Sequence, residues 1–268
     1  MKTLMAMGGA LNPHKPVILK EFVRRAGGEQ AVIAILPQAS AMDDTGRYYE
    51  SLFLDLGAKR AEAIEFRQRR EADSPERLAV LEKASGIFIA GGNQMRLTSL
   101  ISGTKFAAGL HQAYARGAVL GGTSAGAAVL SKIMFAYGKS GPTPREAIAQ
   151  FLAGFGFTEK IIFDQHFRQR DRFGRLAYAV AAAPNLLGVG IDEDTAAILL
   201  DDDELTVTGS GSVTILDGTQ LSATDVAEIE KKAPIAVSGL HLHILTDGCS
   251  FRFSTRQANI PPKVLLSE

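Results

Sequence analysis

Residues 121–127 read Gly121-Gly122-Thr123-Ser124-Ala125-Gly126-Ala127, and this stretch decides the fold. An apolar β-type run, residues 117–120, precedes it, and an Ala-rich run, residues 125–132, follows it with the pattern of the first turns of a helix. A serine with a glycine two residues to either side, at a strand-to-helix junction, is typical of a nucleophile elbow. The turn is so tight that bulky side chains beside the serine would clash. A Gly-rich turn with a helix-capping serine, or a phosphate cradle, remains an alternative from this stretch alone.

Length and composition predict an ordinary soluble globular protein. The chain has 268 residues, of which 46% are apolar and 22% are charged, with 29 basic and 29 acidic side chains. A net charge of zero argues against nucleic acid or an anionic membrane as the main partner. The single cysteine, Cys249, excludes an internal disulfide and favours a reducing compartment. The first apolar run is too short for a signal peptide, and none approaches the ~20 residues that span a bilayer. We therefore expect a cytoplasmic protein.

Strand and helix patterns alternate about five times in the first 130 residues. Apolar runs predict strands at 3–7, 31–36, 61–66, 86–90 and 117–120, and amphipathic segments predict helices at 15–25, 43–56, 74–84, 97–101 and 106–116. This alternation predicts an α/β fold with a doubly wound, mostly parallel sheet and helices on both faces. Further strands are expected at 161–163, 187–190 and 196–200, with a helix at 172–183 between the first two. Beyond residue 204, alternating β-branched and polar residues predict antiparallel C-terminal strands. No linker or repeat divides the chain, so we expect one domain, residues 1–268.

Three Gly-rich stretches follow predicted strands: Gly8-Gly9, Gly91-Gly92 and Gly121-Gly122. In open α/β sheets, ligands bind beyond the carboxyl ends of the strands. All three turns should therefore meet at the edge of the sheet that carries the binding site.

A serine nucleophile needs a base, and the base needs an orienting group. His166 is the best candidate for the base, because it ends an apolar strand and sits among polar residues. Glu193 follows another predicted strand within an acidic run, although such a residue can equally be a turn former or a cap. The other histidines occupy a surface loop, a helix and one face of a late strand: His14, His111, His241 and His243.

An arginine cluster begins two residues after His166. Its members are Arg168, Arg170, Arg172 and Arg175. Three of them share a helical face and could simply be solvated, but Asp164 and Gln165 lie directly beside them in the sequence. Guanidinium forks bind carboxylates in pairs of hydrogen bonds, and an aspartate can take a guanidinium. Together these groups suit a zwitterionic ligand that carries several carboxylates.

Five segments, in this order and spacing, resemble the cyanophycinase group of serine peptidases, the family that also contains aspartyl dipeptidase. They are Gly91-Gly92-Asn93-Gln94, the 121–127 elbow, Asp164-Gln165-His166-Phe167, the arginines at 170, 172 and 175, and Gly190-Ile191-Asp192-Glu193. The likeness to aspartyl dipeptidase is weaker, because that enzyme shares the elbow but not the D-Q-H-F-x-x-R-x-R-x-x-R string. Asn93 departs from the group, where this position is often acidic.

The resemblance implies a role for each matching residue. Ser124 would be the nucleophile, His166 the base and Glu193 the group that orients the base. The backbone N–H groups of Ala125, Gly92 and Asn93 would form the oxyanion hole. A specificity pocket would contain Gln94, Asp164, Gln165, Arg170, Arg172 and Arg175, with Asp164 pairing with a substrate guanidinium and the arginines holding carboxylates.

The resemblance also implies a substrate, which is cyanophycin, a poly-aspartate backbone with arginine attached through each β-carboxyl. The products would be β-aspartyl-arginine dipeptides, no metal or cofactor would be needed, and the family suggests a homodimer. One alternative is a relative that cleaves only short aspartyl or isoaspartyl peptides. Another is a non-catalytic, nucleotide-binding α/β module, against which the missing Walker lysine and the absence of G-x-G-x-x-G after the first strand both count.

Overall fold

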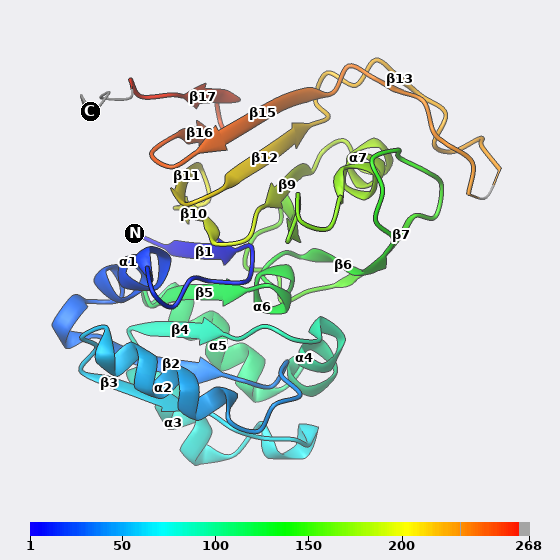
Figure 1. Cartoon of the computed structure of the whole chain (residues 1–268). Coiled ribbons are helices and arrows are strands. Elements are labelled where there is room, and N and C mark those ends of the chain that lie inside the picture. The colour runs from blue at the N-terminus through cyan, green and yellow to red at the C-terminus, as the bar shows by residue number, and fades with distance from the viewer. Residues whose placement is uncertain (231, 263–268) are drawn as a thin grey trace.

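The computed structural model describes residues 1–230 and 232–262, and its centre is a nine-stranded sheet (Figure 1). Its strands, in spatial order, are β17 (Gln257–Asn259), β16 (Ser250–Arg252), β11 (Glu204–Gly209), β10 (Thr195–Leu200), β1 (Thr3–Met7), β5 (Val119–Thr123), β4 (Gly86–Ile89), β2 (Val32–Leu36) and β3 (Arg60–Ala63). Within this sheet, β1, β5, β4, β2 and β3 run parallel to one another. The other four strands, β10, β11, β16 and β17, are antiparallel to their neighbours. The predicted α/β fold with antiparallel C-terminal strands is confirmed.

Helices cover both faces of the parallel half, and the alternation of side chains along β1 shows why. Met5 and Met7 pack on one face with Phe22 of α1 and Phe53 of α2, whereas Leu4 belongs to the core on the other face. The helices are α1 (Val17–Arg25), α2 (Thr45–Asp55), α3 (Pro75–Lys83), α4 (Gln94–Ile101), α5 (Lys105–Ala115), α6 (Ala125–Ala128) and α7 (Phe173–Ala182), with 3-10 turns at Gly28–Gln30 and Arg69–Glu71. Since both faces of β1, β2 and β4 are buried, their sequences read as unbroken apolar runs.

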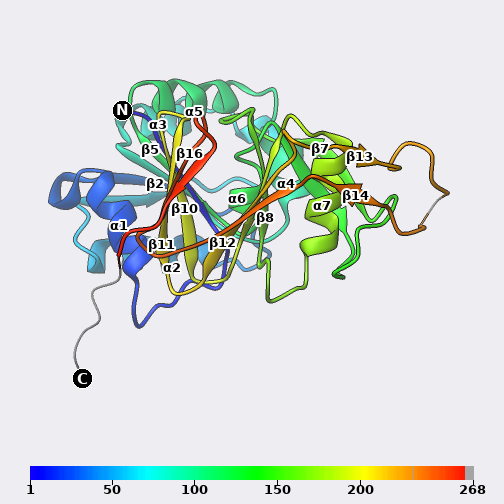
Figure 2. The ribbon, with the colours of Figure 1, turned by 90° about the horizontal axis from the view of Figure 1, so that it is seen from above.

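A second sheet of four strands lies beside the first, and sequence reasoning did not separate it (Figure 2). Its order is β15 (His241–Thr246), β12 (Ser212–Asp217), β9 (Leu187–Ile191) and β8 (Ile161–Gln165). β8 and β9 are parallel, β12 and β15 are antiparallel to their neighbours, and α7 packs on this sheet. The carboxyl end of β8 reaches the end of β1, where the N–H of His166 donates to the carbonyl of Gly8 at 2.8 Å. The two sheets therefore meet where the predicted site residues lie.

The helix after the elbow is shorter than its Ala-rich sequence predicts. It ends at Ala128 rather than near Lys132. The carbonyl of Val129 accepts from Phe155 N, and the carbonyl of Leu130 accepts from Phe157 N, so these carbonyls are not free to continue the helix. The chain instead enters a hairpin of β6 (Ile133–Gly138) and β7 (Ala149–Ala153), and a loop that contains the Gly/Pro-rich residues 139–144 connects the two strands.

A short ribbon of β13 (Ala223–Thr224) and β14 (Val237–Ser238) projects from one side of the molecule (Figures 1 and 2). The single domain over residues 1–268 stays a prediction, and residues 231 and 263–268 lie outside the described part of the chain. Within residues 1–230 and 232–262, no helix is both long and apolar enough to cross a membrane.

Candidate active site

Ser124 stands at the turn between β5 and α6 with φ 52° and ψ −113°, a backbone conformation that L-residues rarely adopt. The two flanking glycines make this turn possible. A methyl group on Gly122 would lie 2.2 Å from the carbonyl oxygen of Gly126, and one on Gly126 would lie 2.2 Å from that of Ile89. The backbone segments thus approach too closely for any side chain, which is the geometry of a nucleophile elbow.

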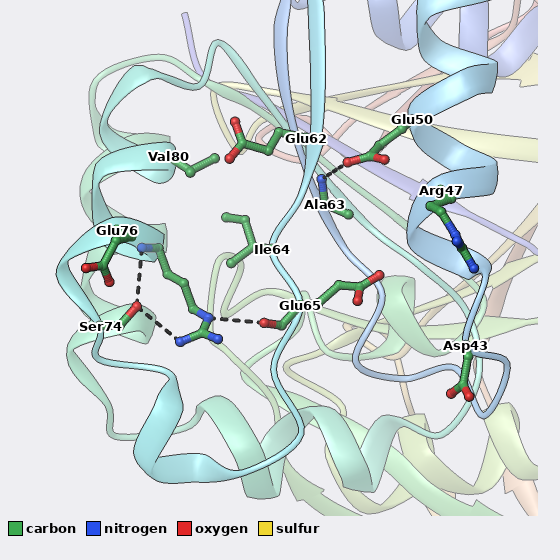
Figure 3. A pocket seen from close by; sticks show the side chains of 11 residues that line it. Asp43, Arg47, Glu50, Glu62, Ala63, Ile64, Glu65, Ser74, Glu76 and Val80 are labelled. Atoms are coloured by element: carbon green, nitrogen blue, oxygen red, sulfur yellow. Dashed lines mark hydrogen bonds between the residues drawn. The ribbon is translucent and has the colours of Figure 1, made fainter.

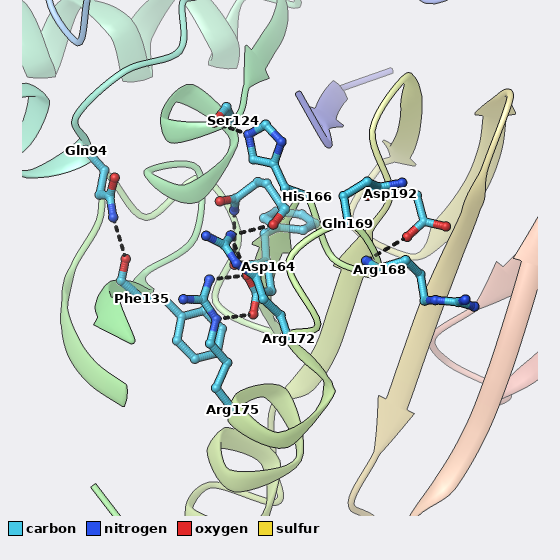
Figure 4. Close-up of polar contacts among 12 residues, drawn as sticks. Gln94, Ser124, Phe135, Asp164, His166, Arg168, Gln169, Arg172, Arg175 and Asp192 are labelled. Atoms are coloured by element: carbon cyan, nitrogen blue, oxygen red, sulfur yellow. Dashed lines mark hydrogen bonds and ion pairs between the residues drawn. The ribbon is translucent and has the colours of Figure 1, made fainter. Parts of the chain in front are cut away.

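His166 links the serine to an acid. Its Nε2 lies 2.8 Å from Ser124 Oγ, and its Nδ1 lies 2.6 Å from Glu193 Oε1. Figure 4 shows the ring pointing from the end of β8 toward the serine. His166 is buried, whereas the Glu193 side chain keeps a third of its surface exposed. The structure therefore brings together the three residues that the sequence singled out, from the ends of β5, β8 and β9.

Two predicted oxyanion donors are free and one is not. Neither Ala125 N nor Gly92 N has a hydrogen-bond acceptor among the described residues. The turn lies against the serine, since a methyl group on Gly91 would be 3.3 Å from Ser124 Cβ. Asn93 N, however, donates to the carbonyl of Ala39 at 2.9 Å, so it does not supply a free N–H. The Asn93 side chain caps α4 instead, by accepting from Met95 N at 2.9 Å.

Asp164 does not face a substrate, contrary to the expectation that it pairs with a substrate guanidinium. It is fully buried, and both of its oxygens already bind arginines of the chain. Arg175 donates from Nε at 2.6 Å and from Nη2, and Arg172 donates from Nη1 at 3.1 Å (Figure 4). Arg175 is itself buried, and its guanidinium lies over the Phe135 ring at 4.8 Å. Asp164 and Arg175 are thus a buried ion pair behind the site.

The remaining pocket residues differ in how accessible they are. Arg170 is exposed, and Arg172 is partly exposed at the start of α7. Gln94 donates from Nε2 to the carbonyls of Phe135 and Ala136, which ties α4 to β6. Gln165 is buried and donates to the carbonyl of Phe163. Of the predicted pocket, Arg170, Arg172 and Gln94 therefore retain surface toward solvent.

The burial of His166 and the two arginines near it favour its neutral form. Burial lowers the pKa of His166 below its ordinary value of 6.5, and the hydrogen bond with Glu193 opposes this. The positive charges of Arg170 and Arg172 lower the pKa of His166 further. Burial also lowers the pKa of Arg172 to about 10, although Asp164 counteracts this, so Arg172 stays charged at neutral pH. A neutral imidazole at neutral pH is able to accept a proton from the serine.

One contact at the site was missed by sequence reasoning. Gln169 Oε1 accepts from the backbone N–H of Glu193 at 3.1 Å, so the loop after β8 holds the residue that faces His166. A glutamine three residues after a histidine is no signal in itself. Asp192, the neighbour of Glu193, is buried and accepts from Arg168 N and Ser212 N, which makes it a structural anchor.

A surface hollow of about 720 Å³ lies elsewhere, along β3 between α2 and α3 (Figure 3). Several acidic side chains line it, and three of them have partners within the chain. Glu50 accepts from Ala63 N at 2.7 Å, Asp43 pairs with Arg67, and Glu62 pairs with Arg60. Nor do three or more His, Cys, Asp or Glu side chains converge on a metal-sized space anywhere in the described part of the chain.

An α/β sheet with a serine elbow, a histidine and an acid in contact defines the class of serine hydrolases. The sequence pattern of peptidase family S51 matches residues 4–208. The chain is 41% identical to a cyanophycinase of Synechococcus elongatus, with 97% of this chain and 83% of that protein aligned. It is 39% identical to a cyanophycinase of Geminocystis herdmanii, over 95% of each. This chain belongs to peptidase family S51, a family of serine-type peptidases, and its predicted resemblance to the cyanophycinase group is confirmed.

A solved structure shares the fold. The crystal structure of a peptidase from an acI-B1 Actinobacterium superposes with a TM-score of 0.66, at 23% identity, over 94% of this chain and 97% of that one.

Proposed function

We propose that this chain is a serine exopeptidase that hydrolyses cyanophycin to β-aspartyl-arginine dipeptides through an acyl-enzyme. One observation carries the proposal. The hydrogen-bonded series from Ser124 Oγ through His166 to Glu193, at 2.8 and 2.6 Å, occurs in a chain that is 41% identical to cyanophycinases. Such a series activates a serine for acyl transfer.

Each residue of the series would have one task. His166 Nε2 accepts the Ser124 proton as Oγ attacks the scissile carbonyl, and it then protonates the leaving amine. Glu193 holds Nδ1–H and stabilises the imidazolium that forms. The free N–H groups of Ala125 and Gly92 would hold the oxyanion. The leaving amine is that of the terminal dipeptide; water then attacks the acyl-enzyme with His166 again as the base, which releases the shortened polymer and restores Ser124.

The accessible cations would select the substrate. Arg170 and Arg172 would bind the free carboxylates at the end of the polymer, and Gln94 would contact its backbone. Asp164, Gln165 and Arg175 would support this surface from behind rather than contact the substrate. Binding of a terminal carboxylate would place only the end unit at Ser124, which is the basis of exopeptidase action.

We also propose that the enzyme acts in the cytoplasm as a homodimer. The homodimer follows from the family resemblance, and the cytoplasm from the single cysteine. Sedimentation of the purified protein at several concentrations measures the oligomeric state directly, and a monomer at all concentrations would contradict the dimer.

The test of the proposed function is an assay of the purified protein on insoluble cyanophycin and, separately, on short β-aspartyl peptides. Ser124→Ala should fold and lose hydrolysis by about three orders of magnitude or more. Ser131→Ala is the matched control, because Ser131 lies seven residues further on, is fully buried and should leave the rate unchanged. Retention of more than about a tenth of the activity in Ser124→Ala would remove it as the nucleophile.

The same assay separates the alternatives. Cleavage of short peptides without cyanophycin hydrolysis would identify a dipeptidase of this family. A binding module would hydrolyse neither substrate, and Ser124 would not react with a serine-directed organophosphate.

A further inference from the structure

Three successive carbonyls at the end of β1 bind the backbones at the three candidate catalytic positions. The carbonyl of Met7 accepts from Ser124 N at 3.0 Å, and that of Gly8 accepts from His166 N at 2.8 Å. The carbonyl of Gly9 accepts at 2.9 Å from Asp194 N, the N–H that follows Glu193. One short segment, Met7-Gly8-Gly9, therefore touches β5, β8 and β9 at their carboxyl ends.

The residues held in this way have unusual backbones. Ser124, His166 and Asp194 have φ of 52°, 50° and 48°, in the left-handed region that disfavours side chains. Such conformations persist only where the surroundings fix them. Ser124 follows β5 of the nine-stranded sheet, and His166 follows β8 of the four-stranded sheet. The hydrogen bonds that the carbonyls of Met7 and Gly8 accept therefore fix these two residues relative to each other.

The absence of side chains at Gly8 and Gly9 is also required by the site. A methyl group on Gly9 would lie 2.3 Å from His166 Cε1 and 2.6 Å from its Nε2. A methyl group on Gly8 would lie 1.8 Å from the carbonyl oxygen of Asp192. The imidazole of His166 therefore lies directly against the backbone of Gly9, and its Nε2 faces Ser124.

We propose that Met7-Gly8-Gly9 is the positioning element of the active site, and that Gly9 is a positioning residue for the His166 ring. This inference rests on the catalytic roles proposed above. The carbonyls fix the three backbones in register, and the bare surface of Gly9 leaves the imidazole room to reach Ser124 and Glu193 together. Gly9 acts through His166 and does not touch the substrate.

The test compares Gly9→Ala with Gly117→Ala. Both glycines have φ of 101°, but nothing lies within 4 Å of a methyl group on Gly117. The two variants therefore carry similar backbone strain, and only one displaces the imidazole. Gly9→Ala should lower kcat by about 100-fold with KM changed little, because a displacement of about 1 Å has that effect. Gly117→Ala, which carries the backbone strain without the clash, should show a smaller fall in Tm and keep the kcat of the folded protein.

A second readout follows the ring without substrate. The proton between His166 Nδ1 and Glu193 gives a downfield resonance, which Gly9→Ala should shift or remove and Gly117→Ala should preserve. If Gly9→Ala keeps this resonance, or has a kcat within about tenfold of Gly117→Ala, the inference is overturned.

If Gly9→Ala does not fold, a second pair of variants carries the test. Asp194 and Asp201 flank β10, share φ of 48° and bind backbone groups just outside β1, after its end and before its start respectively. Asp194 N donates to Gly9 O and its Oδ1 accepts from Asn12 N at 3.0 Å, whereas Asp201 N donates to Lys2 O and its Oδ1 accepts from Lys2 N at 2.7 Å. Asp194→Ala should lower kcat about tenfold, and Asp201→Ala, at the far end of β1, should not. Equal effects would refute the positioning role.

The outcome also separates this inference from the proposed function. A wild-type protein that does not hydrolyse cyanophycin would contradict the function, while the downfield resonance and the rate of Ser124 labelling by an organophosphate would still test the positioning role of Gly9.

Discussion

Replacement of Asp164 by asparagine distinguishes a buried counterion from a residue that reads the substrate. The carboxylate is fully buried and accepts from Nε and Nη2 of Arg175, whose side chain is only 6% exposed, and from Nη1 of Arg172. Asparagine keeps the size of the side chain and one acceptor oxygen but removes the charge. Asp164→Asn therefore leaves the guanidinium of Arg175 buried without its counterion.

The cost follows from the burial of both partners. Breaking a buried ion pair by neutralising one partner costs about 3–5 kcal/mol of unfolding free energy. For a chain of this size, each kcal/mol lowers Tm by about 2–4 °C, so Tm should fall by about 6–20 °C. Asp217→Asn is the matched control, because Asp217 is also buried but its partner Arg256 is 37% exposed. Since Arg256 can be hydrated when the pair is broken, this change should cost only about 1–2 kcal/mol.

The assay combines thermal unfolding with kcat/KM for two substrates, one whose β-linked residue is arginine and one with an uncharged side chain of similar length. Because Asp164 acts from behind the site, both substrates should lose kcat/KM by the same factor. An unchanged Tm together with a loss confined to the arginine substrate would refute this reasoning and return Asp164 to the specificity pocket.

Two further variants test the electrostatics of the site. Arg170→Ala removes a positive charge that lowers the pKa of His166, so that pKa should rise. The acid limb of the plot of kcat/KM against pH should therefore move to higher pH. An acid limb at the wild-type pH would contradict this role of Arg170. Glu193→Gln should lower kcat by about 10³–10⁴-fold in steady-state assays, because the amide no longer stabilises the imidazolium; full activity would remove Glu193 from the mechanism.

Much of the fold could be predicted because parallel, doubly covered strands have unbroken apolar sequences. Residues 31–36 are of this kind, and the structure places β2 there. The separation of the strands into two sheets could not be predicted, because it depends on long-range pairing. β12 alternates as β11 does, yet it pairs with β9 rather than with β11. Alternation identifies a strand but not its neighbours.

The contact between Ser124, His166 and Glu193 was predictable because each residue follows an apolar strand, and such ends meet at one edge of the site. Which of the predicted pocket groups are free to bind a substrate could not be predicted. Asp164 meets Arg175 only because α7 folds back onto the end of β8, eleven residues later in the chain. In the same way, the N–H of Asn93 is occupied by Ala39, which follows a different strand. Sequence proximity to a motif shows which groups are present, but tertiary contacts decide which of them are free.

The burial of Asp164 changes how the site selects its substrate. The carboxylate of Asp164 lies against both Arg172 and Arg175, so it balances only one of their two positive charges. Arg170 adds a further, exposed positive charge. Arg170 and the charge that Asp164 leaves unbalanced would attract carboxylates rather than guanidinium groups. Arg170 and Arg172 also help burial to lower the pKa of His166, which favours the neutral base. In the proposed mechanism, recognition of an acidic chain end and activation of the serine would depend on the same guanidinium groups, so a variant that weakens one should alter the other.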